Sequence, residues 1–165
     1  MGDILSRFAF IGLVIVLFLG GINDNYKKME DKLYISVRDT TDDFYHKVKT
    51  SGVITRQEYD EFLANLGATS RNYDVKLLYK KSKAYPLKPT DSSYTAEKPW
   101  IVLYDEYRTD IILKNVYGDP QIFKMGKGDF FQVEVTDIST KGLFQVNSYK
   151  NIHTINGGMI TNEVT

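Results

Sequence analysis

Apolar residues run almost without interruption through the start of the chain. The segment Phe8–Ile22 contains no polar residue, and the apolar stretch reaches back to Ile4 with only Ser6 and Arg7 inside it. A helix rises ~1.5 Å per residue, so a helix over 4–22 approaches the ~30 Å thickness of the hydrocarbon core of a bilayer. The pattern predicts a transmembrane anchor over residues 1–25.

A cleaved secretory signal peptide is the alternative for this segment. Arg7 would supply its charged start and the apolar run its hydrophobic region. The sequence that follows, Gly20-Gly21-Ile22-Asn23-Asp24, lacks the small-x-small pattern of a good cleavage site, which favours an uncleaved anchor. Gly12, Gly20 and Gly21 are candidates for close packing against another membrane helix, although they form no GxxxG motif.

Beyond residue 25 the apolar positions take up the spacing of one helix face. They recur at intervals of 3, 4, 4, 7 and 4, with charged residues between them. The stripe consists of Tyr26, Met29, Leu33, Val37, Phe44 and Val48. It predicts one long helix from near Ile4 to near Lys49, ending at Gly52. Its first half would lie in lipid, and its second half would pack on a domain formed by residues 26–165.

A second helix has signals at both of its ends. Thr55 and Glu58 have the spacing of a capping box, in which each side chain bonds the backbone amide of the other. Apolar residues follow at helical spacing up to Leu66, and Gly67 ends the pattern. The sequence therefore predicts a short helix from Thr55 to Gly67.

The rest of the chain predicts a small, mostly antiparallel sheet. Residues 73–80 and 130–138 alternate apolar and polar positions, as half-buried strands do. Residues 143–149 are expected to pair back as a hairpin, and 152–155 or 159–160 to add an edge strand. Glycines predict turns at 126–129, at Gly142 and at 157–158.

The middle of the chain is harder to assign. Three prolines and several serines and threonines predict a long exposed loop over 81–99, which includes most of the basic run 80–83. Residues 100–103 could form a strand, but Tyr104, Tyr107 and Ile111 favour a helix over 105–116. The fold class expected is α+β: a long N-terminal transmembrane helix, a second helix and a mostly antiparallel sheet.

Composition adds mainly exclusions. The 21 basic and 21 acidic residues balance, and no basic stripe of the kind that binds nucleic acid is present. The chain has no cysteine and only two histidines, far apart, so neither a metal site nor a bound cofactor is expected. The acidic pairs Asp42-Asp43 and Asp105-Glu106 are expected on helices, where neighbouring positions point apart. No catalytic residues and no enzymatic activity are predicted.

Tyrosine is the one residue type that indicates a contact surface. Four of the 12 tyrosines, Tyr85, Tyr94, Tyr104 and Tyr107, lie in or near the expected 81–99 loop. Tyrosine gives a large contact area at low entropic cost, so these residues are candidates for recognising a peptide or glycan. Packing over a small β core explains them nearly as well.

Several short blocks resemble a known family. The residues are Phe44 and Val48, then Gly52-x-Ile54-Thr55, Tyr59-x-x-Phe62-x-x-x-Leu66, Ala68-Thr69, Tyr73-Asp74-Val75, and later Gly128-Asp129-Phe130-Phe131-x-Val133-x-Val135. Together with the apolar start, this pattern is similar to small pilin-like envelope proteins of Gram-positive, clostridial-type bacteria. These proteins occur in loci for Tad-type pili and related secretion machinery.

The resemblance implies a pseudopilin or minor pilin, a structural or assembly component without catalytic residues. Its partners would be the membrane, other pilin-like or secretion-apparatus subunits, and a second copy of the chain. It also implies a domain outside the cell, whereas Arg7 on one flank and Lys27, Lys28 and Lys32 on the other leave the side open. Phe8–Ile22 lacks the glutamate of processed type IV pilins, which implies an accessory role. The alternative is an extracytoplasmic binding module that uses the 81–99 loop.

Overall fold

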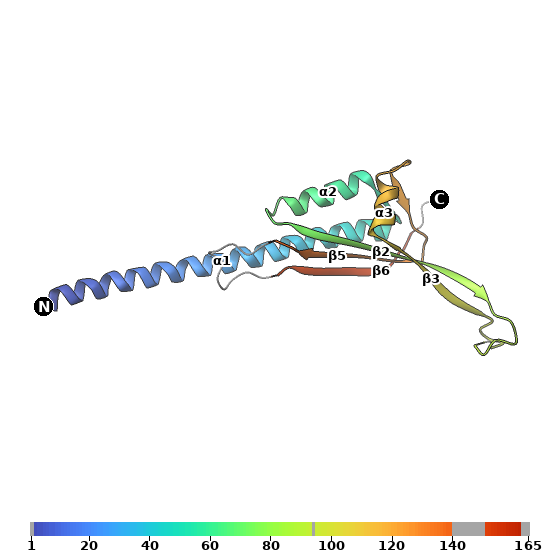
Figure 1. Cartoon of the computed structure of the whole chain (residues 1–165), viewed down its shortest axis with the longest axis horizontal. Coiled ribbons are helices and arrows are strands. Elements are labelled where there is room, and N and C mark those ends of the chain that lie inside the picture. The colour runs from blue at the N-terminus through green and yellow to red at the C-terminus, as the bar shows by residue number, and fades with distance from the viewer. Residues whose placement is uncertain (1, 94, 140–150, 163–165) are drawn as a thin grey trace.

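A computed structural model shows a long helix joined to a small α+β domain (Figure 1). It describes residues 2–93, 95–139 and 151–162, except for the side chains of 2–9, 15, 17–24 and 26. The described elements, in chain order, are α1 (Gly2–Ser51), β1 (Val53–Thr55), α2 (Arg56–Gly67), β2 (Tyr73–Pro86), β3 (Trp100–Arg108), α3 (Thr109–Val116), β4 (Ile122–Lys124), β5 (Phe130–Asp137) and β6 (His153–Met159).

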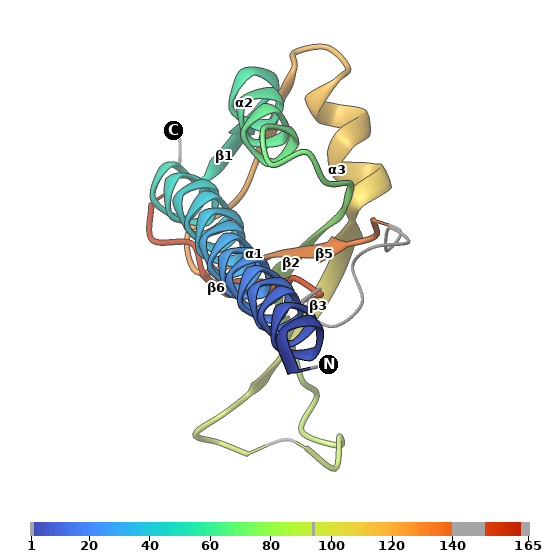
Figure 2. The ribbon, with the colours of Figure 1, turned by 90° about the vertical axis from the view of Figure 1, so that its left-hand side faces the viewer.

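The first helix is continuous, as predicted. Its first half projects from the domain, and its second half lies along β5 and β6 (Figures 1 and 2). The buried side chains of this second half include Val37, Phe44 and Val48 from the predicted stripe. Gly52 ends the helix with a φ of +70°, and its N–H donates to the Val48 carbonyl at 2.8 Å. A left-handed backbone conformation at this position favours glycine.

The second helix begins with the predicted capping box. The Glu58 N–H donates to Thr55 Oγ1 at 3.2 Å, and the Thr55 N–H donates to Glu58 Oε2 at 3.1 Å. The helix buries Tyr59, Phe62 and Leu66. Phe62 stacks on Phe44 of α1, with ring centroids 4.3 Å apart and planes at 10°. This stack joins the two helices over the core.

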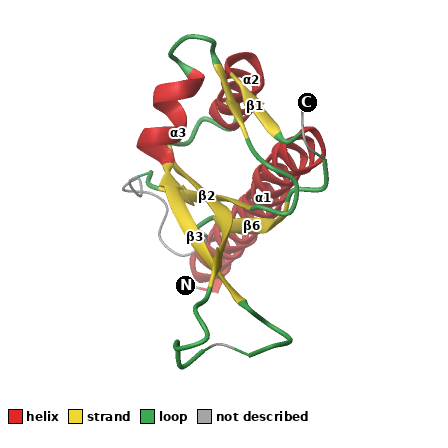
Figure 3. Cartoon of the chain, turned by 90° about the vertical axis from the view of Figure 1, so that its right-hand side faces the viewer, coloured by secondary structure: helices red, strands yellow, loops and turns green. Residues whose placement is uncertain are grey.

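The main sheet has the order β3-β2-β5-β6, and all its neighbours are antiparallel. Its inner face carries the buried side chains of β2 and β5 and packs towards α1 and α2. These residues are Leu77, Tyr79, Phe131, Val133 and Val135. β1 and β4 form a separate two-stranded sheet, which lies with α2 and α3 at one end of the domain (Figure 3).

The predicted loop over 81–99 and helix over 105–116 were partly wrong. β2 continues to Pro86 and pairs with β3 from Leu78–Arg108 to Pro86–Trp100, so only 87–99 connects them. The helix begins at Thr109. Aromatic and β-branched residues at 100–104 suit a strand once β2 lies beside them. The spacing of Tyr104, Tyr107 and Ile111 matched a helix only by coincidence.

The turn predicted at Gly157-Gly158 was also wrong, because both glycines lie inside β6. A Cβ on Gly157 would lie 3.0 Å from the Phe130 ring, and one on Gly158 would overlap the Tyr45 hydroxyl of α1. Glycine is therefore required by close packing and not by a turn. β6 supplies the expected edge strand, whereas the strand predicted at 143–149 and the turn at Gly142 lie outside the described residues.

The α+β class and the antiparallel sheet are thus confirmed. Within the part of the chain whose side chains are described, no helix contains a stretch long and apolar enough to cross a membrane. The anchor predicted for residues 1–25 falls mostly on side chains outside that part. It therefore stays a prediction.

Candidate interaction surfaces

The projecting half of α1 exposes apolar side chains. Five of them are 47–68% exposed: Phe10, Ile11, Leu13, Val14 and Val16. With ~3.6 residues per turn, these positions lie on all sides of the helix. A helix that is apolar all round needs an apolar environment on every side, and not one partner along one stripe. This segment is the first candidate surface.

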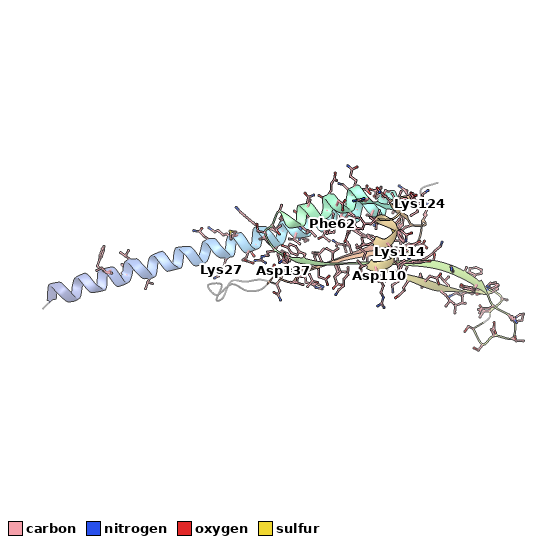
Figure 4. All side chains as sticks on the ribbon, turned by 45° about the horizontal axis from the view of Figure 1, so that its top comes forward. Lys27, Phe62, Asp110, Lys114, Lys124 and Asp137 are labelled. Carbon is pink, nitrogen blue, oxygen red and sulfur yellow. The ribbon has the colours of Figure 1, made fainter. Side chains whose placement is uncertain are left out.

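Glycine in the same segment leaves room for a neighbour. A Cβ added at Gly12 would meet nothing within 4 Å. Gly20 and Gly21 belong to the same helix, within the range whose side chains are not described. Three exposed lysines, Lys27, Lys28 and Lys32, follow the apolar segment, and Lys27 lies near the point where α1 meets the sheet (Figure 4).

A buried ionic cluster holds α1 at this meeting point. Arg71 binds Glu30 of α1 and, through Nη1 at 2.7 Å, Asp137 Oδ2 at the end of β5. The three side chains are at most 9% exposed. Burial alone would lower the pKa of Arg71, but the hydrogen bonds and charges of the two carboxylates raise it. The guanidinium therefore stays charged and joins the helix to the sheet.

The second candidate surface is an arm formed by the outer part of the β2–β3 hairpin, residues 82–104. β5 accompanies β2 only as far as Lys80, so from Ser82 onwards β2 has β3 as its one strand neighbour among the described residues. The arm extends from the domain at the end opposite the N-terminus of α1 (Figure 1). The two candidate surfaces therefore lie at opposite ends of the molecule.

Both faces of the arm carry exposed apolar groups. Successive residues of a strand point to opposite faces, so Trp100, Val102 and Tyr104 lie on one face, and Ile101 and Leu103 lie on the other. Cross-strand partners share a face. These five side chains are 38–52% exposed, and Tyr85, the partner of Ile101, is 43% exposed. A sheet in a small domain ordinarily buries one of its faces. The arm buries neither, so it is a candidate contact surface.

The four candidate tyrosines do not form one cluster. Tyr85 and Tyr104 lie on opposite faces of the arm. Tyr107 is partly buried, with its ring 5.5 Å from that of Tyr79 and 6.3 Å from that of Phe123, so it belongs to the core. Tyr94 lies outside the described residues.

Charged pairs fasten the base of the arm. Asp105 and Glu106 lie on β3 and not on the helix predicted for them; Asp105 binds Lys83, and Glu106 binds Lys80 at 2.8 Å. The hydrogen bond and charge of Lys80 lower the pKa of Glu106. The hydrogen bond and charge of Asp105 raise the pKa of Lys83. The basic run at 80–83 is therefore part of the strand pairing.

Asp129 is a buried carboxylate at the same base. It accepts hydrogen bonds from the Tyr79 hydroxyl at 2.5 Å, the Ser82 N–H at 2.8 Å, the Ser82 hydroxyl at 2.9 Å and the Gly126 N–H at 3.2 Å. Burial raises the pKa of Asp129, but these bonds favour the ionised form more strongly and the pKa lies below its ordinary value. Burial and the bond to Asp129 raise the pKa of Tyr79.

The carboxylate also fixes the turn before β5. The turn predicted at 126–129 is present, with Gly128 at a φ of +85° and the Asp129 N–H 3.2 Å from the Gly126 carbonyl. A Cβ on Gly126 would lie 2.8 Å from Asp129 Oδ2. The Asp129 carboxylate accepts hydrogen bonds from Ser82 of β2, just beyond the last pair of β2 with β5. It therefore positions the arm where the arm leaves the sheet.

The remaining polar groups do not converge. His46 is exposed on α1, and His153 Nε2 lies 3.2 Å from Glu134 Oε1 on the outer face of the sheet. Asp42 accepts a hydrogen bond from Asn156 of β6, whereas its neighbour Asp43 is exposed. Across the residues that the structure covers, no group of three His, Asp or Glu side chains has an arrangement that could hold a metal ion.

Comparison of the chain with family models, with curated proteins and with solved structures found no match in any of the three. The likeness to small pilin-like envelope proteins therefore stays a prediction. The function is argued below from the two surfaces.

Proposed function

We propose that the protein is a membrane-anchored, non-enzymatic structural or assembly component of a pilus-like or secretion apparatus, with its domain outside the cytoplasm. The observation that carries this proposal is the placement of two apolar surfaces at opposite ends of one molecule. One is the projecting half of α1, and the other is the arm (Figure 1).

Energetics support an anchor at the helical end. Burying a large apolar side chain contributes ~1.5–3 kcal/mol. Five such side chains are exposed between Phe10 and Val16 alone. The free energy of unfolding of a whole domain is only ~5–15 kcal/mol, so leaving this segment in water is costly on the same scale. A bilayer, with neighbouring helices packed in it, covers every side of such a helix.

The continuity of α1 supports a structural role. The same helix that carries the apolar segment supplies Phe44 and Val48 to the core. The buried cluster of Glu30, Arg71 and Asp137 holds it to the sheet within the stretch that carries the exposed lysines. Helix and domain are therefore one unit, which suits a subunit that transmits its position in a membrane to an assembly.

Fractionation tests the anchor. We expect the full chain, expressed in a bacterium, to stay with the membrane pellet after alkaline carbonate extraction. Val16→Lys places a charge in the apolar segment and should move a large part of the protein to the supernatant. Met29→Lys is the matched control, because Met29 is also exposed on α1 but lies beyond the apolar segment. A full-length protein found wholly in the supernatant would refute the anchor.

A second candidate function is recognition of a peptide or glycan by the arm. The observation that favours it is a shallow, open hollow lined by Trp100, three prolines, Ala84 and Leu87. Aromatic and proline rings stack on apolar ligand faces. If this is the function, Trp100→Ala should abolish binding of the peptide or glycan. The same change should leave the protein in the membrane pellet after carbonate extraction. Capture that is unaffected by Trp100→Ala would remove this candidate.

A further inference from the structure

Among the residues that the structure describes, the outer edge of β3 lacks the usual protection of an edge strand. Natural sheets protect their edges with lysine, proline, bulges or a covering element. β3 is the last of the described strands in its sheet, and its pairing with β2 runs without a bulge. Residues 100–104 of this edge contain no charge and no proline, and all five side chains are exposed. Such an edge is a template for another strand.

We propose that this edge pairs with the same edge of a second copy of the chain. The two β3 strands would run antiparallel about a two-fold axis, with Val102 opposite Val102 of the second copy. The proposal deepens the proposed function and rests on it in one respect, that the arm is a contact surface. It does not depend on the membrane anchor.

The sequence of the edge is complementary to itself in this register. Trp100 lies opposite Tyr104 of the second copy, and Ile101 lies opposite Leu103, so apolar side chains meet on both faces. Cross-strand apolar and aromatic pairs of this kind stabilise a sheet, and a two-fold axis gives each unlike pair twice.

Neighbouring registers fit less well. Directly opposite residues share a face, so in a two-fold pair the neighbouring registers have Leu103 or Ile101 opposite itself. With Leu103 central, Asp105 lies opposite Ile101 of the second copy. With Ile101 central, Pro99, which has no N–H, lies opposite Leu103. The apolar run is therefore matched along its whole length only when Val102 is central. This self-complementarity favours a second copy over an unrelated strand.

The pairing would have a direct consequence for the shape of the assembly. The arm points away from the N-terminus of α1 along the long axis of the molecule (Figure 1). Antiparallel arms direct the two domains away from each other, so the α1 N-termini lie at opposite ends of the dimer. The two copies would be joined end to end, which is the arrangement needed to connect two opposed membranes or two facing assemblies.

Disulfide formation tests the register. The chain has no cysteine, so a single introduced thiol reports one contact. Directly opposite residues in an antiparallel pair have Cα atoms ~4.5–5.5 Å apart, which a disulfide spans. We expect full-length Val102→Cys, purified in detergent and mildly oxidised, to run as a dimer on a non-reducing gel and as a monomer after reduction.

Leu103→Cys is the matched control, because Leu103 neighbours Val102 and is no less exposed. In the proposed register each residue 103 lies opposite residue 101 of the other copy. The two residues at 103 are therefore diagonal neighbours, and their Cα atoms lie ~8–9 Å apart, beyond disulfide range. Ile101→Cys mixed with Leu103→Cys should instead cross-link. Equal dimer yields from Val102→Cys and Leu103→Cys would overturn the register, and a Val102→Cys that stays monomeric would overturn the pairing.

A measurement without a disulfide completes the test. We expect light scattering to give the mass of a dimer for the original chain and of a monomer for Val102→Lys. Ile138→Lys changes another exposed apolar residue, outside the arm, and should leave the dimer intact. A mass that Val102→Lys does not change would contradict the proposal. Because these experiments use detergent, they can fail while carbonate extraction still supports the anchor, and the reverse also holds.

Discussion

At the scale of single residues, the structure depends on polar groups that were not expected to be buried. Asp129 accepts four hydrogen bonds at the base of the arm, and Arg71 joins two carboxylates beneath α1. In each case a charged group is removed from water and retains its charge because its partners are in place. Removing the charge of either side chain should therefore lower the free energy of unfolding.

Removing the charge of Asp129 should destabilise the fold. Asp129→Asn keeps the shape but places an amide where donors now point, so we expect a loss of ~1–3 kcal/mol in the free energy of unfolding. Urea unfolding at pH 7, followed by circular dichroism, measures this loss. Asp91→Asn is a suitable control, because Asp91 is exposed in the connecting loop and should change stability little. Equal stabilities of the two variants would contradict this role.

The same residue should produce a pH dependence. The pKa of Asp129 is lower in the folded chain than in the unfolded chain, so the unfolded chain takes up the proton first. The stabilisation is complete above the ordinary carboxyl pKa of ~3.9 and is lost as the pH falls below it. The difference in stability between the original chain and Asp129→Asn should shrink between pH 5 and pH 3, values bracketing ~3.9. A difference that grows on acidification would contradict this direction.

Replacing Arg71 should have a larger effect. Arg71→Met leaves Glu30 and Asp137 buried without their shared cation, which typically costs ~3–5 kcal/mol. Arg38→Met is the matched control, because the Arg38–Asp39 pair is more than half exposed and such pairs contribute ~0–1 kcal/mol. Thermal unfolding of the two variants side by side makes the comparison. Similar melting temperatures would show that the buried cluster does not secure α1.

These residue-level contacts could not be predicted from sequence. Arg71 is separated from Glu30 by 41 positions, and Asp129 from Ser82 by 47. Local patterns report turns and helix ends, and they correctly indicated a turn at 126–129. They do not report which distant backbone amide a carboxylate will reach once the strands have paired. The signal available was only that Asp129 precedes a strand after two glycines.

At the scale of helices and strands, elements determined by residues close in sequence were predicted better than elements determined by pairing with a distant strand. The second helix was predicted because Thr55 and Glu58, three residues apart, determine its start. The long helix was predicted because its apolar stripe repeats locally and Gly52 ends it. β3 was foreseen only as a possible strand over 100–103, because its partner is β2, across a 13-residue connection (87–99), and pairing overrides a weak helical spacing. The arm, and with it the second candidate surface, was therefore not foreseen as a structured element.

The packing of β6 on α1 gives a prediction at this scale. Gly158→Ala would place a methyl group against the hydroxyl of the buried Tyr45, and we expect a loss of ~1–3 kcal/mol from overpacking. Tyr45→Phe removes that hydroxyl, so the double variant should recover part of the loss. Gly67→Ala, where a Cβ meets nothing within 4 Å, should cost little. Chemical denaturation of all four variants tests the account, and an absence of recovery in the double variant would contradict it.

At the scale of the whole molecule, the two apolar surfaces define a direction. The helical end suits a bilayer, and the arm, at the far end, suits another strand (Figure 1). The domain between them holds both in place through the Arg71 cluster and Asp129. This arrangement suits a structural subunit, because an apolar surface at each end can make an extended contact.

The most direct test of this account is the location of the domain in intact cells. Ile155→Cys introduces the only thiol of the chain at an exposed site on β6. With the protein in the carbonate-resistant membrane pellet, a membrane-impermeant maleimide added to cells without an outer membrane should label Ile155→Cys fully before lysis. A cytoplasmic single-cysteine protein should remain unlabelled in the same cells. Labelling of Ile155→Cys only after lysis would contradict the account.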